Sequence, residues 1–523
     1  MYHRKKSYKT HSKGFIEDST PNAEKALFIF FHLTIASAFY GSALFSVETP
    51  IGSIFPFRIL VPITAVLFLG SCITKAKNPL KDLPRVKLWG VIFGLSLEFF
   101  GIVSLFRATS FSHTFRRLFN LSFVMLLFIL VILYLDNHRK IRAFVCNLTI
   151  NTVIILLMGI YETFGNNYVF IDKYIGKGKY NFFDLIGLKP ATVTFANTND
   201  LNAGIFMIIT AISCYYIFTI LKSSNERLKN VYSCILIFLF VASGYLAECS
   251  GARLVKISFY LYVFMMLGVF YFYSKKRIYI PIIILLCSLT FSYGGDYFNI
   301  NARAINTTND VVYYAQKAVY DTRIKIGSEH AVMPMKKPHI PLRDKISLED
   351  EFFSEDENGN STVNLSHSGG IRLALIESAF KMFAQSKTLG VGLGNGEMIL
   401  KAHAEQTGGI TNFHCYPARL IAEYGIFIII PALVLVYYVL TGIIKSHRIS
   451  RQKRDTTLFA HILTVITALL VFPLLVTAPS DAQDIAVMWI YIAFYLCAIS
   501  SSDNGNIFNL LEDRDDIDFQ RLN

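Results

Sequence analysis

The sequence has few charged residues for its length. Of its 523 residues, 17% are Asp, Glu, Lys or Arg, whereas 53% are hydrophobic, and the mean hydropathy is +0.44. In a soluble protein about a quarter of the residues are charged. This shortage of charge excludes an ordinary soluble globular protein and predicts an integral membrane protein.

Cysteine is also sparse, and its spacing indicates no site. The eight cysteines form no CxxC pair and no Cys/His spacing typical of zinc. Some of them fall inside apolar runs: Cys72, Cys146, Cys214 and Cys287. We therefore expect no disulfide framework, no metal site and no cofactor.

Two nucleotide-binding motifs and a nucleic-acid partner are disfavoured as well. The glycine-rich stretch GVGLGNG, residues 390–396, lacks the GK[ST] of a P-loop. It also follows a helical pattern rather than a strand, so it does not fit a Rossmann motif. The net charge of +13 would suit nucleic acid, but most charges lie in short connections between apolar runs. No nucleic-acid partner is expected.

What the chain has instead is a series of apolar runs long enough to cross a bilayer. A helix that does so needs roughly 17–25 residues. The runs are 27–47, 52–73, 88–106, 118–135, 143–164, 200–221, 230–248, 254–273, 278–294, 418–443, 457–477 and 485–501. We predict an all-α polytopic membrane protein with about twelve transmembrane helices.

The distribution of Lys and Arg predicts the orientation of these spans. The connections on one side are all basic, such as KAKNPLKDLPRVK and KSHRISRQKRD, whereas ETPIGS and APSDAQD on the other side contain neither residue. Because cytoplasmic loops are enriched in Lys and Arg, the basic tail 1–26 is placed in the cytoplasm. An even number of spans returns the acidic tail 502–523 to the same side.

Two connections on the predicted outer side are long, at about 165–199 and 295–417. The second begins as a polar segment of mixed charge, for which we expect irregular chain. It then carries apolar residues at helical spacing from Ile371 to Met382, which predicts an amphipathic helix on the membrane surface or over a cavity. This divides the chain into spans one to nine (27–294), an outer loop with the candidate site (295–417) and spans ten to twelve (418–501).

Several polar residues lie at the outer boundary of the predicted spans. They are Arg253, Arg372, His414 and Arg419. An arginine at the end of a span usually reaches to the lipid headgroups, so each one alone has a structural explanation. His414 alone fits a structural hydrogen bond as well as it fits catalysis.

Further charges lie inside or against the spans. Glu98 is in the middle of a span and is either functional or paired with Arg58. Arg107, Arg116 and Arg117 lie on the outer side, against the general distribution of positive charge. They are expected to bind headgroups or to attract an anionic lipid substrate.

Four segments in order resemble motifs of the O-antigen ligase and O-antigen polymerase superfamily of bacterial surface-glycan assembly. They are VTFANTNDLNAGI (193–205), SGARLVKI (250–257), IRLALIESAFKMFAQSKTLGVGLGNG (371–396) and HCYPARLIAEYG (414–425). In the last, Glu423 and Gly425 follow His414 by nine and eleven residues, as in the family motif. Cys415 and Thr198 stand where that family has Asn and Pro.

The resemblance implies a glycosyltransferase of the GT-C type in the bacterial inner membrane, with its active site on the extracytoplasmic face. Its donor would be a glycan on undecaprenyl diphosphate, and the reaction would be inverting and metal-independent. The acceptor is either another lipid-linked repeat unit, for a polymerase, or lipid A core, for a ligase. Membrane lipids, a chain-length regulator and a flippase are the implied partners.

The resemblance also implies roles for individual residues. His414 and Arg372 would be catalytic, with His414 acting on the acceptor hydroxyl. Arginines suit a diphosphate leaving group because the guanidinium binds phosphate oxygens in bidentate fashion. The implied diphosphate and glycan ligands are Arg253, Arg419, Asn199 and Asp200, and the implied supporting residues are Glu423, Gly392 and Gly425.

Two explanations of other classes stay open. A twelve-span transporter or polysaccharide flippase would have internal halves of similar hydropathy, and no clear repeat is visible in the sequence. A scaffold without activity would tolerate replacement of His414 and Arg372.

Overall fold

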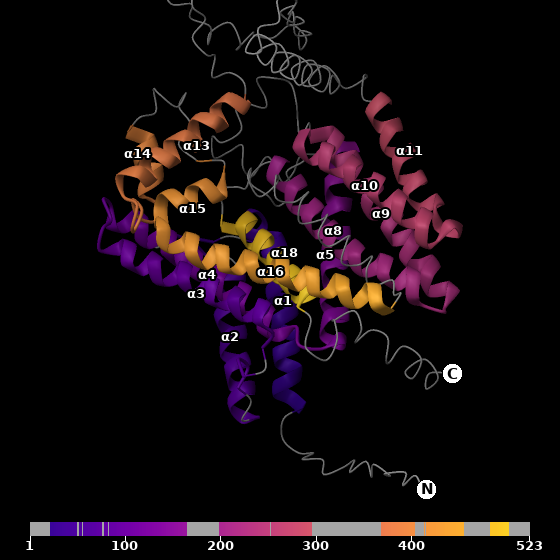
Figure 1. Ribbon diagram of the computed structural model, residues 1–523, viewed down its shortest axis with the longest axis horizontal. Coiled ribbons are helices and arrows are strands. Elements are labelled where there is room, and N and C mark those ends of the chain that lie inside the picture. Colours follow the sequence, from indigo (N-terminus) through magenta and orange to yellow (C-terminus); the bar gives the residue numbers. More distant parts are fainter. Residues whose placement is uncertain are drawn as a thin grey trace, which may run out of the picture.

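The computed structural model describes residues 21–45, 47–49, 52–54, 56–75, 78–81, 83–164, 198–250, 253–294, 368–402, 413, 415–453 and 482–500. These residues are mostly helical (Figure 1). The predicted all-α class is confirmed for them apart from one small antiparallel hairpin, β1 (Val47–Thr49) with β2 (Gly52–Ile54). The eleventh predicted span, residues 1–20 of the N-terminal tail, the acidic C-terminal tail and residues 295–367 of the outer loop lie outside the described residues.

The N-terminal part of the chain forms five helices. They are α1 (Pro21–Phe45), α2 (Pro56–Thr74), α3 (Arg85–Leu105), α4 (Phe111–Tyr134) and α5 (His138–Phe164). They coincide with the first five predicted spans, except that residues 52–54 of the second run form β2. Long apolar runs bounded by basic or proline-containing turns explain this agreement.

Four more helices follow and cover the next four predicted spans. They are α8 (Thr198–Lys222), α9 (Glu226–Ser250), α10 (Arg253–Tyr273) and α11 (Tyr279–Gly294), with a 3₁₀ turn, η1 (Lys275–Arg277), before the last. Among the residues that the structure describes, eight helices, α1 to α5 and α8 to α10, are long and apolar enough to cross a membrane. The chain is thus built as a multi-pass membrane protein.

The C-terminal part differs from the prediction at the tenth run, 418–443. It is not one helix but two, α15 (Tyr416–Tyr424) and α16 (Ile426–Lys453), separated by Gly425. Gly425 has a φ of 65°, in the left-handed region that glycine tolerates. The other helices here are α13 (Ser368–Gln385), α14 (Asn395–Ala402) and α18 (Ala482–Ile499).

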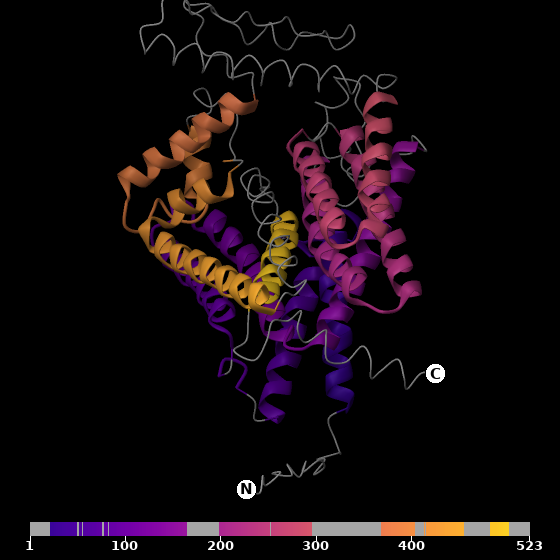
Figure 2. The same ribbon diagram turned by 45° about the vertical axis from the view of Figure 1, so that its right-hand side comes forward.

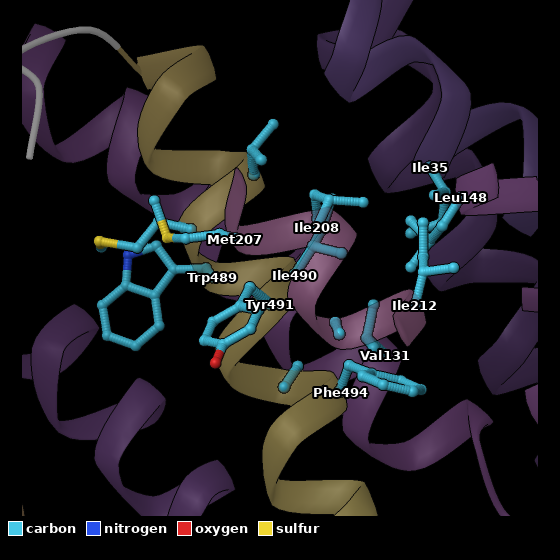
Figure 3. Packing of buried hydrophobic residues seen from close by; sticks show 14 of the residues in the cluster. Ile35, Val131, Leu148, Met207, Ile208, Ile212, Trp489, Ile490, Tyr491 and Phe494 are labelled. Carbon is cyan, nitrogen blue, oxygen red and sulfur yellow. The ribbon is translucent and has the colours of Figure 1, made fainter. Parts of the chain in front are cut away.

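The core is organised around α8 and α18. The apolar part of α8, Gly204–Leu221, is 94% buried, as expected for a helix that is apolar all round. Figure 3 shows Met207, Ile208 and Ile212 of α8 beside Ile490 and other residues of α18. The surrounding helices instead expose large apolar side chains, such as Val66 and Leu69 of α2, as lipid-facing helices do.

A small helical layer, α13 to α15, lies at one end of the bundle (Figure 2). Leu375, Ala379 and Met382 of α13 are buried, and α13 packs against α15. Glu377 and Lys381 on the opposite face are exposed and form an ion pair of 2.9 Å between Oε1 and Nζ. The predicted helix is therefore present, with one buried and one exposed face. Its place on the membrane surface or over a cavity stays a prediction.

Candidate functional site

The structure places the backbone of four predicted site residues. Asn199 and Asp200 lie in the first turn of α8, Arg253 is the first residue of α10, and Arg372 lies near the start of α13. Their side chains are outside the described residues, and so is His414. The assigned roles of these five residues stay predictions.

Successive helices of the α8–α11 group run in opposite directions, because short connections join α8 to α9 and α10 to α11. The starts of α8 and α10 therefore share one end of this group with the end of α11. Figure 2 shows α13 to α15 at the same end of the molecule, across from α11. The elements that carry the predicted site residues thus lie at one end of the molecule (Figure 2). That they form one site stays a prediction.

Arg419 and Glu423 are adjacent on one face of α15, as residues four apart in a helix are. Nε of Arg419 donates to Oε2 of Glu423 at 3.0 Å. The other carboxylate oxygen of Glu423, Oε1, accepts the backbone N–H of Gly394 at 2.9 Å. Both oxygens of this buried carboxylate are therefore satisfied.

Glu397 of α14 extends this pair to a second helix. Its Oε1 lies 3.5 Å from Nη1 of Arg419, and its Oε2 forms an ion pair with Nη2 of Arg117 on α4. Nε2 of His113, one turn before Arg117, is 3.7 Å from the same Oε2. Arg117, Glu397, Arg419 and Glu423 form what we term the four-residue ion network.

The four-residue ion network is nearly closed to solvent at its centre. The relative exposure is 1% for Glu423, 4% for Glu397 and 9% for Arg419. Burial raises the pKa of Glu423, against the lowering effect of Arg419. Burial also lowers the pKa of Arg419, but Glu423 and Glu397 outweigh this effect, so the net shift is upward and the guanidinium stays charged.

Two carboxylates therefore face two guanidiniums. Burying charges is costly unless they are paired and hydrogen-bonded, a condition that this arrangement meets.

Backbone hydrogen bonds join the glycine-rich turn to the end of α15. The N–H groups of Val391 and Gly392 donate to the carbonyls of Ala422 and Glu423, both at 2.9 Å. The N–H of Ile426 donates to the carbonyl of Lys387 at 2.9 Å. The first two bonds satisfy carbonyls that the end of α15 leaves without a partner within the helix.

This close approach requires glycine at two positions. A Cβ on Gly425 would lie 2.5 Å from the backbone nitrogen of Gly390, and a Cβ on Gly390 would lie 2.4 Å from the carbonyl carbon of Glu423. Both have a φ of 65°. Gly392, with a φ of 95°, completes the turn. Gly425 is thus a contact point between two backbones, and it ends α15 for that reason.

Asn395 attaches the glycine-rich turn to the connection between α3 and α4. Its Nδ2 donates to the carbonyls of Val391 at 2.7 Å and Arg107 at 3.2 Å, and its Oδ1 accepts the N–H of Thr109 at 3.2 Å. Nη2 of Arg107 also donates to Oγ of Ser386 at 3.0 Å. Arg107 and Arg117 thus contact the layer above them. Their expected binding of lipid headgroups or of an anionic lipid substrate stays a prediction.

Sequence reasoning missed Asn395 and Glu397. The sequence signal for them was their position: Asn395 lies among the glycines of GVGLGNGEM and Glu397 follows the last of these glycines. It also misplaced Glu423, expected one to two turns inside the tenth span. The residue lies on α15, outside α16, because Gly425 breaks the run.

The mid-span Glu98 accepts a hydrogen bond from Ser122 at 2.7 Å, and Arg58 donates to Asn120 at 2.5 Å.

Comparison with known proteins gives a distant relative. No family model matches the chain. The chain is 19% identical over 480 residues to the teichuronic acid biosynthesis protein TuaE of Bacillus subtilis (strain 168). The similarity covers 91% of this chain and 85% of that protein. It therefore spans the helical bundle and is not confined to one motif.

Proposed function

We propose that the chain is a membrane glycosyltransferase that polymerises undecaprenyl-diphosphate-linked repeat units into a cell-surface polysaccharide. The similarity to TuaE supports a role in cell-surface polysaccharide assembly, because it extends over 91% of the chain. The specific reaction is inferred from the order of the four motifs. α8 and α10 begin, and α13 and α15 lie, at the end of the bundle that carries the four-residue ion network.

The proposed reaction is one displacement at the anomeric carbon of the donor sugar. The acceptor hydroxyl oxygen forms the new bond to this carbon, the bond to the diphosphate oxygen breaks, and the proton of the hydroxyl passes to His414. The configuration is inverted. Arg372 and Arg253 bind the leaving diphosphate, whose growing negative charge they stabilise. Asn199 and Asp200 hold glycan hydroxyls.

Arg419 receives a different role in this proposal from the one its sequence motif implied. Its guanidinium is held by Glu423 and Glu397 and is 9% exposed. We assign it to the support of α15 rather than to the diphosphate. Glu423, Gly392 and Gly425 keep their supporting roles, in which each fixes the turn before α14 against the end of α15.

The location follows from the same scheme. The α13–α15 layer faces the extracytoplasmic side of the inner membrane, where the lipid tail stays in the bilayer and the sugars reach water. Both termini are cytoplasmic. A flippase would supply the donor, and a chain-length regulator would limit the product.

The test is an assay with the purified full-length protein, undecaprenyl-diphosphate-linked repeat units and excess chelator. We expect chain growth by the wild type and its loss in His414→Ala and Arg372→Ala. Lys381→Ala, on the exposed face of α13, is the control and keeps full activity. Normal turnover in the folded His414→Ala and Arg372→Ala variants would contradict the assigned roles. Transfer to a lipid A core without growth would indicate a ligase.

A further inference from the structure

The α13–α15 layer has a small apolar core of its own. Its buried members are Leu375, Ala379, Met382, Leu400, Phe413, Cys415, Ala418 and Ala422. This cluster is distinct from the large core of the bundle, to which Leu393, Tyr416 and Tyr424 of the same layer contribute. The orientation of the layer therefore depends on the contacts that join it to the bundle.

Several of those contacts are polar and reach the α3–α4 region. Asn395 and Ser386 bind the α3–α4 connection, as described above. Glu397 binds α4 itself through Arg117. Of these three residues, Glu397 is the one that contacts both the bundle and α15, because its second oxygen lies 3.5 Å from Arg419.

We propose that Glu397 is a positioning residue, which fixes α15 on α4 and thereby sets the place of the chain entering α15. That chain contains His414 directly before Cys415, the N-cap of α15. The proposal rests on the proposed function in so far as His414 reacts there. Geometry matters strongly for such a group, since a displacement of about 1 Å can cost about a hundredfold in rate.

The chemistry of Glu397 suits this role. One carboxylate oxygen serves Arg117 and the other faces Arg419, so a single side chain couples two cations on two helices. A carboxamide of the same shape would keep a hydrogen bond to one guanidinium and lose the charge shared with both. Glu397→Gln therefore tests the coupling without creating a cavity.

The experiment is a double-mutant cycle on the full-length protein in lipid nanodiscs. The variants are Glu397→Gln, Arg117→Gln and both together, with Arg117→Lys as a milder variant in case Arg117→Gln does not fold. Glu377→Gln and Lys381→Gln form the control pair, because that ion pair is exposed on α13. Hydrogen exchange of residues 386–402 and 415–425 is measured beside kcat and KM.

We expect exchange in both segments to become at least tenfold faster in Glu397→Gln, and kcat to fall by about thirtyfold to a hundredfold with KM within threefold. The double variant is expected to lose no more than the worse single variant, since both remove the same coupling. The control pair leaves exchange and kinetics unchanged.

Unchanged exchange in a folded Glu397→Gln, or losses that multiply in the double variant, would overturn the proposal. A purely structural ion pair would lower the amount of folded protein and leave kcat per folded molecule intact, which also overturns it. If the wild type transferred no glycan, the hydrogen-exchange rates of the single and double variants would still show whether Glu397 and Arg117 act together to hold α15. The proposed function would then fail separately.

Discussion

At the scale of single residues, the site depends on positions where nothing larger than hydrogen fits. Gly390 and Gly425 bring two backbone segments together, and both have a left-handed φ of 65°. The sequence motif marked Gly425 by its distance from His414, but the reason for glycine is a contact with a residue 35 positions earlier. Such a contact cannot be deduced from local pattern.

Gly425→Ala is therefore expected to destabilise the protein by about 2–5 kcal/mol, which combines the strain of a left-handed alanine with the overlap against Gly390. The measurement is thermal or denaturant unfolding in detergent. Gly268→Ala is the control, because a Cβ there meets no atom within 4 Å. In the middle of α10 alanine should leave stability unchanged or raise it by about 0.5–1 kcal/mol. Equal stability of the two variants would contradict the close approach.

At the scale of helices, the sequence predicted most elements and missed one break. The first nine apolar runs correspond to helices because each run is bounded by polar or proline-containing turns that end it locally. The tenth run reads as continuous through EYGIFIII, since the residues after Gly425 are as apolar as any span. Its division into α15 and α16 comes from the packing of Gly390 and from the charges that α15 buries.

Glu397 was missed for a related reason. A glutamate in the first turn of a helix is a favourable and common placement in any protein. Its importance arises from Arg117, which is 280 residues away in sequence.

A second ion pair at the same end of the bundle gives a prediction about helix pairing. Nζ of Lys256 on α10 lies 2.5 Å from Oε2 of Glu248 on α9, and the Tyr260 hydroxyl lies 3.5 Å from Oε1. The two residues lie on either side of Arg253 in the sequence. Because Glu248 is buried and Lys256 is about a quarter exposed, Lys256→Met should cost about 1–3 kcal/mol by removing this cation from a buried carboxylate.

Adding Glu248→Gln to Lys256→Met should restore part of this loss, as seen in unfolding measurements on the double variant. Lys140 and Asp136, a pair of 2.8 Å with both side chains about a third exposed, serve as the comparison. Replacing either residue of this exposed pair should lower the free energy of unfolding by no more than about 0.5 kcal/mol. Strictly additive losses at Lys256 and Glu248 would show that the pair does not hold α9 to α10.

At the scale of the whole molecule, the arrangement of the helices predicts which side of the membrane each connection faces. The α3–α4 connection lies against the α13–α15 layer, whereas the α8–α9 turn follows α8 to the opposite end. Thr109 and Ser224 are exposed positions in these two turns. With the site facing outward, a membrane-impermeant maleimide should label Thr109→Cys in intact cells and Ser224→Cys after permeabilisation. Both are made in a background without the native cysteines. The reverse pattern would place the site in the cytoplasm.

The position of α18 has a consequence for biogenesis. This helix packs against α4 and α8, and also contacts α1 and α3. It is translated long after them. Until it leaves the ribosome, the faces of α4 and α8 that it covers must meet lipid or an insertion chaperone. Among the described helices, α18 is thus the last to be inserted, and it packs against neighbours that are already in the membrane. A ribosome stalled before residue 482 would leave an inserted chain in which α18 is missing from its place against α1, α3, α4 and α8.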